Sequence, residues 1–142
     1  MSWKHFITRV DGKKAQVLLD TQFRDQPAPT AQLPNLMKVT VFNQMDPCGA
    51  LWHPDEAGRL EKVEESLMKA LEQFGNGWAV YVRRVATEGV RTYDVYFGDA
   101  AKLSRAAVVF KEANPTYRIE AEFGKDETWA GYLSWVKEAP PV

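Results

Sequence analysis

The sequence predicts an α+β protein, and three observations support this class. Segments in which apolar and polar residues alternate, as in half-buried strands, are separated by two longer segments whose apolar residues lie three or four positions apart, as in helices. From Met37 to Phe123 the order is strand, helix, strand, strand, helix, strand. This is the split βαβ pattern (βαββαβ), which predicts a ferredoxin-like two-layer sandwich. At 142 residues the chain is expected to form a single domain, 1–142.

An N-terminal β-hairpin is expected before this core. Residues 3–10 and 15–23 flank Asp11-Gly12, a dipeptide that suits a hairpin turn because both positions tolerate a positive φ. Three prolines between residues 27 and 34 lack an amide donor and predict a loop or crossover. Residues 1–36 are therefore assigned to the hairpin and the proline-rich crossover, and residues 37–125 to the core.

The core elements are predicted from periodicity and from the residues at their ends. Pro54 suits a first helical turn, and Asp99 can cap the second helix. The expected elements are a strand around Val39 and Val41, a helix from about Pro54 to Phe74, strands at 78–87 and 91–97, a helix from Asp99 to Asn114, and a strand at 117–123. The acidic residues of the first helix lie outside its apolar stripe and are expected to be solvated; they are Glu56, Glu61, Glu64, Glu65 and Glu72.

A short C-terminal helix is expected from about Glu127 to Glu138, within a segment 126–142, with Asp126 as its N-cap. Its buried face is expected to carry Trp129, Leu133 and Val136. Trp135 points to another side, so we expect it to be partly exposed.

Composition and charge indicate which class of partner the protein can bind and in which cellular compartment it is expected. A net charge of −1 argues against a general nucleic-acid binder, because phosphate binding needs a basic surface. The single cysteine excludes an intrachain disulfide and is compatible with a reducing compartment. The first residues lack the apolar stretch of a signal peptide, and no apolar run approaches the length of a membrane span. We therefore expect a cytoplasmic protein.

The loop 47–53 holds the residues whose side chains are the strongest candidates for a chemical role. Cys48 precedes a helix start and lies five positions from His53, but nucleophilic catalysis also needs an oriented base and an oxyanion site. The two histidines, His5 and His53, are too few for a zinc site without distant carboxylates. We therefore expect no metal, no cofactor and no catalytic residue. A pocket at Cys48, Trp52 and His53 is kept as an alternative.

The sheet face opposite the two core helices is the candidate interaction face. The residues expected to face the helices are Val39, Val41, Val80, Val82, Tyr93, Val95, Ile119 and Phe123. The candidate interaction face then comprises Phe42, Tyr81, Arg83, Asp94, Tyr96, Arg118 and Glu120, together with Trp135 of the last helix. Three fates remain open for this face: coverage by the N-terminal hairpin or C-terminal helix, a protein interface, or nucleic-acid binding. The carboxylates argue against the last.

Three patches of sequence carry a family resemblance. They are the acidic-apolar helix around Glu56, Leu60 and 63–65, the strand from Gly89 to Tyr96, and the tail with Tyr117, Asp126, Trp129 and Tyr132. Together they resemble the bacterial domain-of-unknown-function family 695. The resemblance implies a ferredoxin-like fold and a loose similarity to the B-type regulator of ribonuclease E activity. It implies no known reaction.

The functional expectation is a non-catalytic regulatory or protein-interaction module, whose partner is another protein or a second copy of the chain. One alternative is a small-molecule-binding protein or hydrolase with a pocket near the Pro47–His53 loop. Another is a regulator of RNA metabolism, although direct binding of nucleic acid is not expected.

Overall fold

All six strands of the described residues pair in one antiparallel sheet, in the order β1-β2-β4-β5-β3-β6. The computed structural model describes residues 3–75 and 78–139. The strands are β1 (Trp3–Val10), β2 (Lys13–Asp20), β3 (Asn35–Phe42), β4 (Ala79–Thr87), β5 (Val90–Phe97) and β6 (Arg118–Lys125). The helices in this part of the chain are α1 (Ala57–Gly75), α2 (Ala100–Ala113) and α3 (Ala130–Glu138), with short 3-10 helices η1 (Gln22–Arg24) and η2 (Pro54–Glu56).

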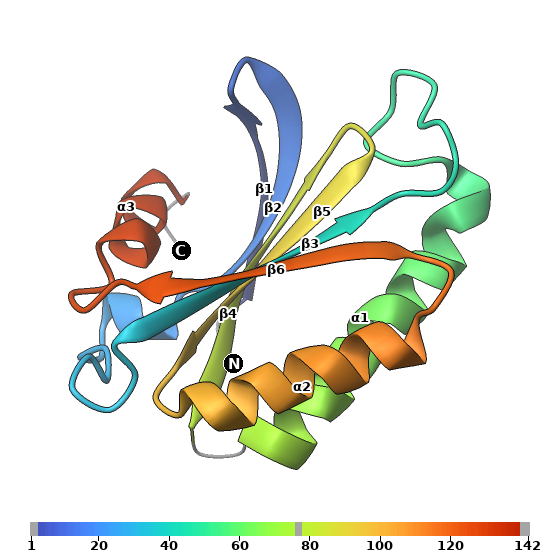
Figure 1. Ribbon diagram of the computed structural model, residues 1–142. Helices are drawn as coiled ribbons and strands as arrows, with labels where there is room; N and C mark the ends of the chain where they lie inside the picture. Colours follow the sequence, from blue (N-terminus) through green and yellow to red (C-terminus); the bar gives the residue numbers. More distant parts are fainter. Residues whose placement is uncertain (1–2, 76–77, 140–142) are drawn as a thin grey trace.

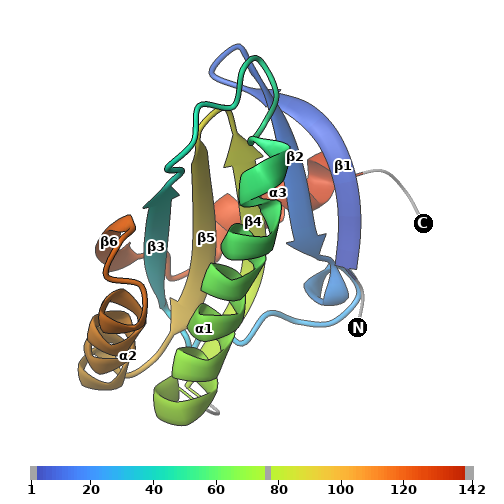
Figure 2. The ribbon, with the colours of Figure 1, turned by 90° about the vertical axis from the view of Figure 1, so that its right-hand side faces the viewer.

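Helices α1 and α2 cover one face of the sheet, and α3 lies against the other (Figures 1 and 2). Helix α1 buries Leu60, Val63, Leu67, Ala70 and Leu71, and α2 buries Leu103, Ala106, Ala107 and Phe110. These side chains form the first core with residues of β3 and β5. A second core joins β2, β4 and α3 on the opposite face. The mixed α/β class predicted from the sequence is therefore confirmed, with apolar cores on both faces of the sheet.

The N-terminal hairpin extends the sheet and does not cover a face of it. Asp11 and Gly12 adopt positive φ values of 52° and 79°, as expected for the turn between β1 and β2. Strand β2 then pairs with β4, with Gln16 opposite Ala86. Figure 1 shows the hairpin curving away from the rest of the sheet at its turn. One end of the sheet is thereby left open between this turn and the loop that follows β3.

A β-bulge in β4 reverses part of the predicted facing. The pairing of β4 with β5 shifts between Tyr81 and Arg83. Val80 and Val82 pack in the core on the α3 face, although they were expected to face the core helices. Tyr81 packs against the α1–α2 core, although it was assigned to the opposite face. Strict alternation through β4 was therefore the wrong assumption.

Helix α3 is held by Trp129, which is fully buried and lies at the N-terminal end of the helix with φ 58°. Its ring stacks on Tyr96 at 4.1 Å, and its indole N–H donates to the carbonyl of Leu33 at 2.8 Å. Trp129, and not Asp126 as predicted, occupies the N-cap position, but the carboxylate of Asp126 accepts from the amides of Ala130 and Gly131 and so satisfies early donors of the helix. Packing thus maintains a backbone conformation that bulky residues rarely adopt.

The predicted buried face of α3 is correct for Trp129 and Val136 and wrong for Leu133. Leu133 is 37% exposed, and Tyr132 is buried in its place. The helix begins at Ala130, three residues later than predicted. Trp129 therefore lies before the helix, and Tyr132 and Val136 form its inward stripe.

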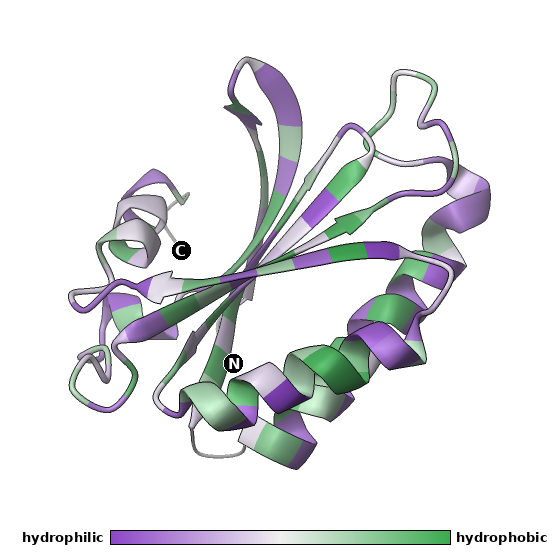
Figure 3. Cartoon of the chain, viewed as in Figure 1, coloured by the Kyte–Doolittle hydropathy of each residue, from purple (hydrophilic) through white to green (hydrophobic). Residues whose placement is uncertain are grey.

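In the edge strand β6, the hydropathy of the residues follows their burial. Apolar and polar residues alternate along β6 (Figure 3), and burial alternates with them over its first five residues. Phe123 lies against Phe97 at 5.8 Å but is largely exposed, since it lies near the end of this edge strand. In the described part of the chain, none of the helices combines the length and hydropathy needed to cross a membrane.

Candidate functional site

The loop between β3 and η2 is anchored by Glu56, which is fully buried. Its carboxylate accepts hydrogen bonds from the amides of Gln44 and Met45, at 2.8 and 2.9 Å, and from the hydroxyl of Tyr117 at 2.7 Å. Burial alone would raise the pKa of Glu56, but these three bonds and nearby Arg59 hold it below its usual value. The expectation that Glu56 is solvated was therefore wrong: it is the internal anchor of the loop.

The other end of the loop lies beside the β4–β5 turn. The amide of Asn43 donates to the carbonyl of Gly89 at 2.9 Å, and the amide of Gly89 approaches the carbonyl of Leu51 at 3.4 Å. Between these contacts, Cys48 and Gly49 adopt positive φ values of 54° and 83°. The turn they form carries the loop back towards the N-terminal hairpin.

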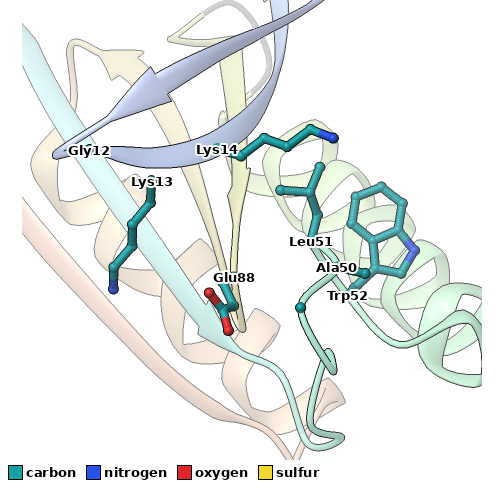
Figure 4. Close-up of a pocket in the computed structure, with 8 residues that line it drawn as sticks. Gly12, Lys13, Lys14, Ala50, Leu51, Trp52 and Glu88 are labelled. Atoms are coloured by element: carbon teal, nitrogen blue, oxygen red, sulfur yellow. The ribbon is translucent and has the colours of Figure 1, made fainter.

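A pocket of about 500 Å³ lies between the hairpin turn, this loop and the β4–β5 turn (Figure 4). Lys14 extends towards the side of Leu51 and Trp52, whereas Lys13 extends in another direction (Figure 4). The pocket is lined by Gly12, Lys13, Lys14, Gly49, Ala50, Leu51, Trp52 and Glu88. Lysine chains on one side and apolar groups on the other make it an amphipathic pocket.

Trp52 also lines a second pocket of about 330 Å³, between β1, β2 and the start of α1. This pocket is lined by His5, Gln16, Trp52, Ala57, Glu61, Glu64, Arg84 and Arg91. We call the two pockets together the hairpin groove. Their side chains provide four cations and three carboxylates, which leaves one net positive charge with the histidine neutral.

Arg91 is the unusual group in the hairpin groove. It is only 5% exposed, and its guanidinium lies 4.6 Å from the centroid of the Trp52 ring. No carboxylate among the described residues lies within 4.0 Å of it, and its Nε donor has no hydrogen-bond partner. A buried charge normally has an ionic partner, because removing it from water is costly. Arg91 is therefore a buried cation without an ion pair among the described residues.

Arg84, the second arginine of the groove, is better matched. It pairs with Glu64 at 2.8 Å and donates to the side chain of Gln16 at 3.2 Å, while its Nε is without a partner. Tyr93 lies opposite Arg84 in the neighbouring strand. Burial and the charge of Glu64 raise the pKa of Tyr93 to about 12, although both arginines oppose the shift. The tyrosine is thus neutral at physiological pH, and the arginines carry the positive charge.

Of the three residues predicted to form a pocket in the loop, only Trp52 lines one. Cys48 is exposed, at the tight turn. His53 is the N-cap of η2, where its Nδ1 accepts from the amide of Asp55 at 3.0 Å. Within the described ranges, no group of three or more His, Cys, Asp or Glu residues could hold a metal ion.

The candidate interaction face is divided by the structure into three parts. Arg83, Asp94, Tyr96 and Trp135 lie together on the α3 face, where Arg83 pairs with Asp94 and the Trp135 ring lies 4.5 Å from the Arg83 guanidinium. Phe42, Arg118 and Glu120 form a separate group at the sheet edge: Arg118 lies over the Phe42 ring at 4.3 Å and pairs with Glu120 at 2.7 Å. Tyr81 lies on the other face, as described above.

Sequence reasoning missed Arg91, Arg84 and Lys14. One signal was available for Arg91. It lies two positions before Tyr93 in a strand whose alternate residues Tyr93, Val95 and Phe97 face the core, so Arg91 occupies an inward position on the same face. Arg84 and Lys14 gave no such signal, because the β4 bulge and the hairpin pairing place them.

Comparison with known families adds a classification. A model described as a family of unknown function, DUF695, matches residues 1–136, which is nearly the whole chain. No curated protein matches the sequence.

Proposed function

Because the chain belongs to the DUF695 family, whose function is unknown, we propose a function from its geometry: a non-catalytic module that binds an acidic peptide segment of another protein in the hairpin groove. The observation that carries this proposal is Arg91, a buried guanidinium with no carboxylate within 4.0 Å of it in the described residues. An aspartate or glutamate of a partner would supply the missing charge.

The shape of the groove favours a chain segment. Its two pockets share Trp52 as a lining residue, and the rim residues Lys13, Lys14, Gly49 and Ala50 are exposed. Sites for small molecules usually enclose most of the ligand. An open groove beside a sheet instead leaves room for a segment to enter and leave at its two ends.

Apolar side chains beside the arginines would contact the partner's aliphatic residues. Trp52 and Leu51 lie on the loop side, and Ile7, which is 56% exposed, lies opposite Gln16 on the hairpin side. Aromatic groups next to an arginine are typical anchors at protein interfaces. We therefore expect a preferred motif that combines a carboxylate with a neighbouring apolar residue.

A peptide-display selection tests this function. The immobilised wild-type chain is expected to enrich random peptides that contain acidic residues next to apolar ones. The Arg91→Met variant should lose this enrichment, and Arg105→Met should keep it, because Arg105 lies on α2 outside the groove. Selection of the same peptides by wild type and Arg91→Met, or of peptides without acidic residues, would contradict the proposal.

A free small anion is the second candidate ligand, because the larger pocket, at about 500 Å³, falls within the size range of small-molecule sites. Calorimetry with citrate separates the two candidates. Binding of citrate that is as tight as that of the selected peptides and is lost in Arg91→Met would favour the small molecule, and much weaker binding, or binding that this variant keeps, would favour the peptide.

We also propose that residues 37–125 form a ferredoxin-like unit in the cytoplasm. The order β4-β5-β3-β6, with α1 and α2 on one face, supports this topology. The free, exposed Cys48 supports a reducing compartment.

A further inference from the structure

A third pocket lies on the α3 face of the sheet, opposite the groove side of β4 and β5. Its volume is about 330 Å³, and its lining includes Lys13, Lys38, Arg83, Thr87, Thr92 and Trp135. We propose that this pocket binds a small oxyanion, the carboxylate or phosphate group of a soluble ligand, with Arg83 as its main donor.

Arg83 supplies donors that nothing in the described chain satisfies. It is 8% exposed, and its Nη2 pairs with a carboxylate oxygen of Asp94. Its Nε and Nη1 are buried and have no hydrogen-bond partner. Buried donors of this kind are rare in native proteins because each unmet bond costs free energy. An oxyanion in the pocket would accept from them.

Trp135 and Asp94 hold the guanidinium in place. The indole ring lies 4.5 Å from the guanidinium carbon and covers one side of it, which limits access of water. Asp94 fixes another edge of the group through the ion pair. The guanidinium of this lining residue is therefore held in a fixed orientation, so a ligand would bind with little loss of side-chain freedom.

The surrounding charge favours an anion. Lys13 and Lys38 stand at the rim with exposed side chains, and Asp11 and Asp94 are the neighbouring acids. Among the charged residues that line the pocket, the cations Lys13, Lys38 and Arg83 outnumber the one carboxylate, Asp11, while Asp94 offsets part of the charge of Arg83 through the ion pair. Thr87 and Thr92 add hydroxyl groups that can donate to further oxygens.

The pocket is too large for one bound water to explain it. A water molecule occupies roughly 30 Å³ in the liquid, whereas the pocket has a volume of about 330 Å³. The site is also separate from the anchor of the hairpin groove: Lys13 lines both pockets, but Arg91 lines only the groove and Arg83 only the pocket on the α3 face.

Titration of the full chain with inorganic phosphate and, separately, with acetate tests the proposal by nuclear magnetic resonance. At least one anion is expected to shift the indole signal of Trp135 and the backbone amides of Lys38 and Thr92 in a saturable way. Saturation by phosphate alone would assign a phosphate ligand, by acetate alone a carboxylate, and by both a general oxyanion site. The absence of saturable shifts at these residues with either anion would overturn the proposal.

Two variants in the pocket, each with a control outside it, test whether the anions bind there. Lys38→Ala removes an exposed side chain and is expected to weaken binding about fivefold, while Lys69→Ala on α1 leaves it unchanged. The double variant Arg83→Met with Asp94→Leu replaces the ion pair by apolar groups, which keeps the fold intact, and should abolish binding. Unchanged binding in the double variant would refute the site. Arg91→Met should bind both anions like wild type. The oxyanion site can therefore be confirmed or refuted whatever the outcome of the peptide test.

Discussion

Glu56 and Arg91 are both charged and both buried, but they are matched differently within the described residues. Three hydrogen bonds meet the Glu56 carboxylate, whereas Arg91 contacts the neutral side chains of Trp52 and Tyr93. The Glu56 carboxylate organises the start of the loop that carries Trp52, whereas Arg91 lies under Trp52 with no carboxylate within 4.0 Å in the described residues. At the scale of single residues, the first group therefore has a structural role, and we propose that the second binds a ligand.

The lowered pKa of Glu56 makes a prediction about acid stability. Because its folded-state pKa lies below the usual value of 4.5, folding favours the charged form. This stabilisation is present above pH 4.5 and is lost as the pH falls through the folded-state pKa. In Glu56→Gln, the free energy of unfolding at neutral pH should fall by about 1–3 kcal/mol, because an amide cannot satisfy all three donors.

Urea denaturation between neutral and acidic pH checks this prediction. The acid-induced loss of stability should be smaller in Glu56→Gln than in wild type, because this contribution is already missing. Glu65→Gln, at an exposed position of α1, serves as the control and should follow wild type. If the two variants show the same pH dependence, Glu56 is not the anchor of the loop.

Local sequence patterns could not place Glu56 and could place Arg91 only in part. Glu56 is buried through its bond with Tyr117, which lies 61 positions away. Arg91 could be recognised as an inward position, but the loop residue that covers it could not, because its place depends on how the loop folds back over the sheet.

At the scale of elements, helix α3 shows how a short segment becomes ordered through packing. A nine-residue helix is too short to persist alone, so its stability has to come from contacts. Trp129 supplies most of them, through Tyr96, Phe23 and the carbonyl of Leu33. The sequence predicted this element and its main anchor, but not its first residue, and that difference accounts for the exchange of Leu133 for Tyr132.

Two alanine substitutions in and beside α3 test this packing. Trp129→Ala should lower the free energy of unfolding by about 3–5 kcal/mol, because it removes a fully buried aromatic ring and a hydrogen bond. Leu133→Ala should change it by less than about 1 kcal/mol, because this side chain is substantially exposed. Thermal or urea unfolding provides the comparison. Equal losses in the two variants would show that the helix packs through a different face.

The β4 bulge is the element-scale feature that the sequence could not predict. Val80 to Val85 reads as an ordinary strand, and nothing local marks the residue at which the pairing with β5 shifts. Arg83 and Arg84 are adjacent and so point to opposite faces, and the shift sets which face each takes relative to Tyr81: Arg83 lies beside Trp135 and Arg84 beside Glu64. The place of Arg83 in the pocket on the α3 face therefore depends on one irregularity of a central strand.

At the scale of the whole molecule, the sheet separates two pocket regions that meet at the hairpin turn, where Lys13 lines both. The fold class and element order were predictable because they follow from periodicity, and the family match agrees with the resemblance seen in the sequence. The fate of the open face was not predictable, since it depends on long-range docking of α3. The single-domain organisation and weak binding of nucleic acid remain predictions.

The central claim is that Arg91 is kept as a buried, unpaired cation for a ligand, and the most direct test is the unfolding free energy of Arg91→Met in urea. Methionine keeps an unbranched side chain beside Trp52 and removes the charge. If the claim holds, the variant should be as stable as wild type or more stable, by up to about 2 kcal/mol, because an unmatched buried charge costs free energy. A loss of about 2 kcal/mol or more would contradict it, because Arg91 would then be a structural residue that the fold itself requires.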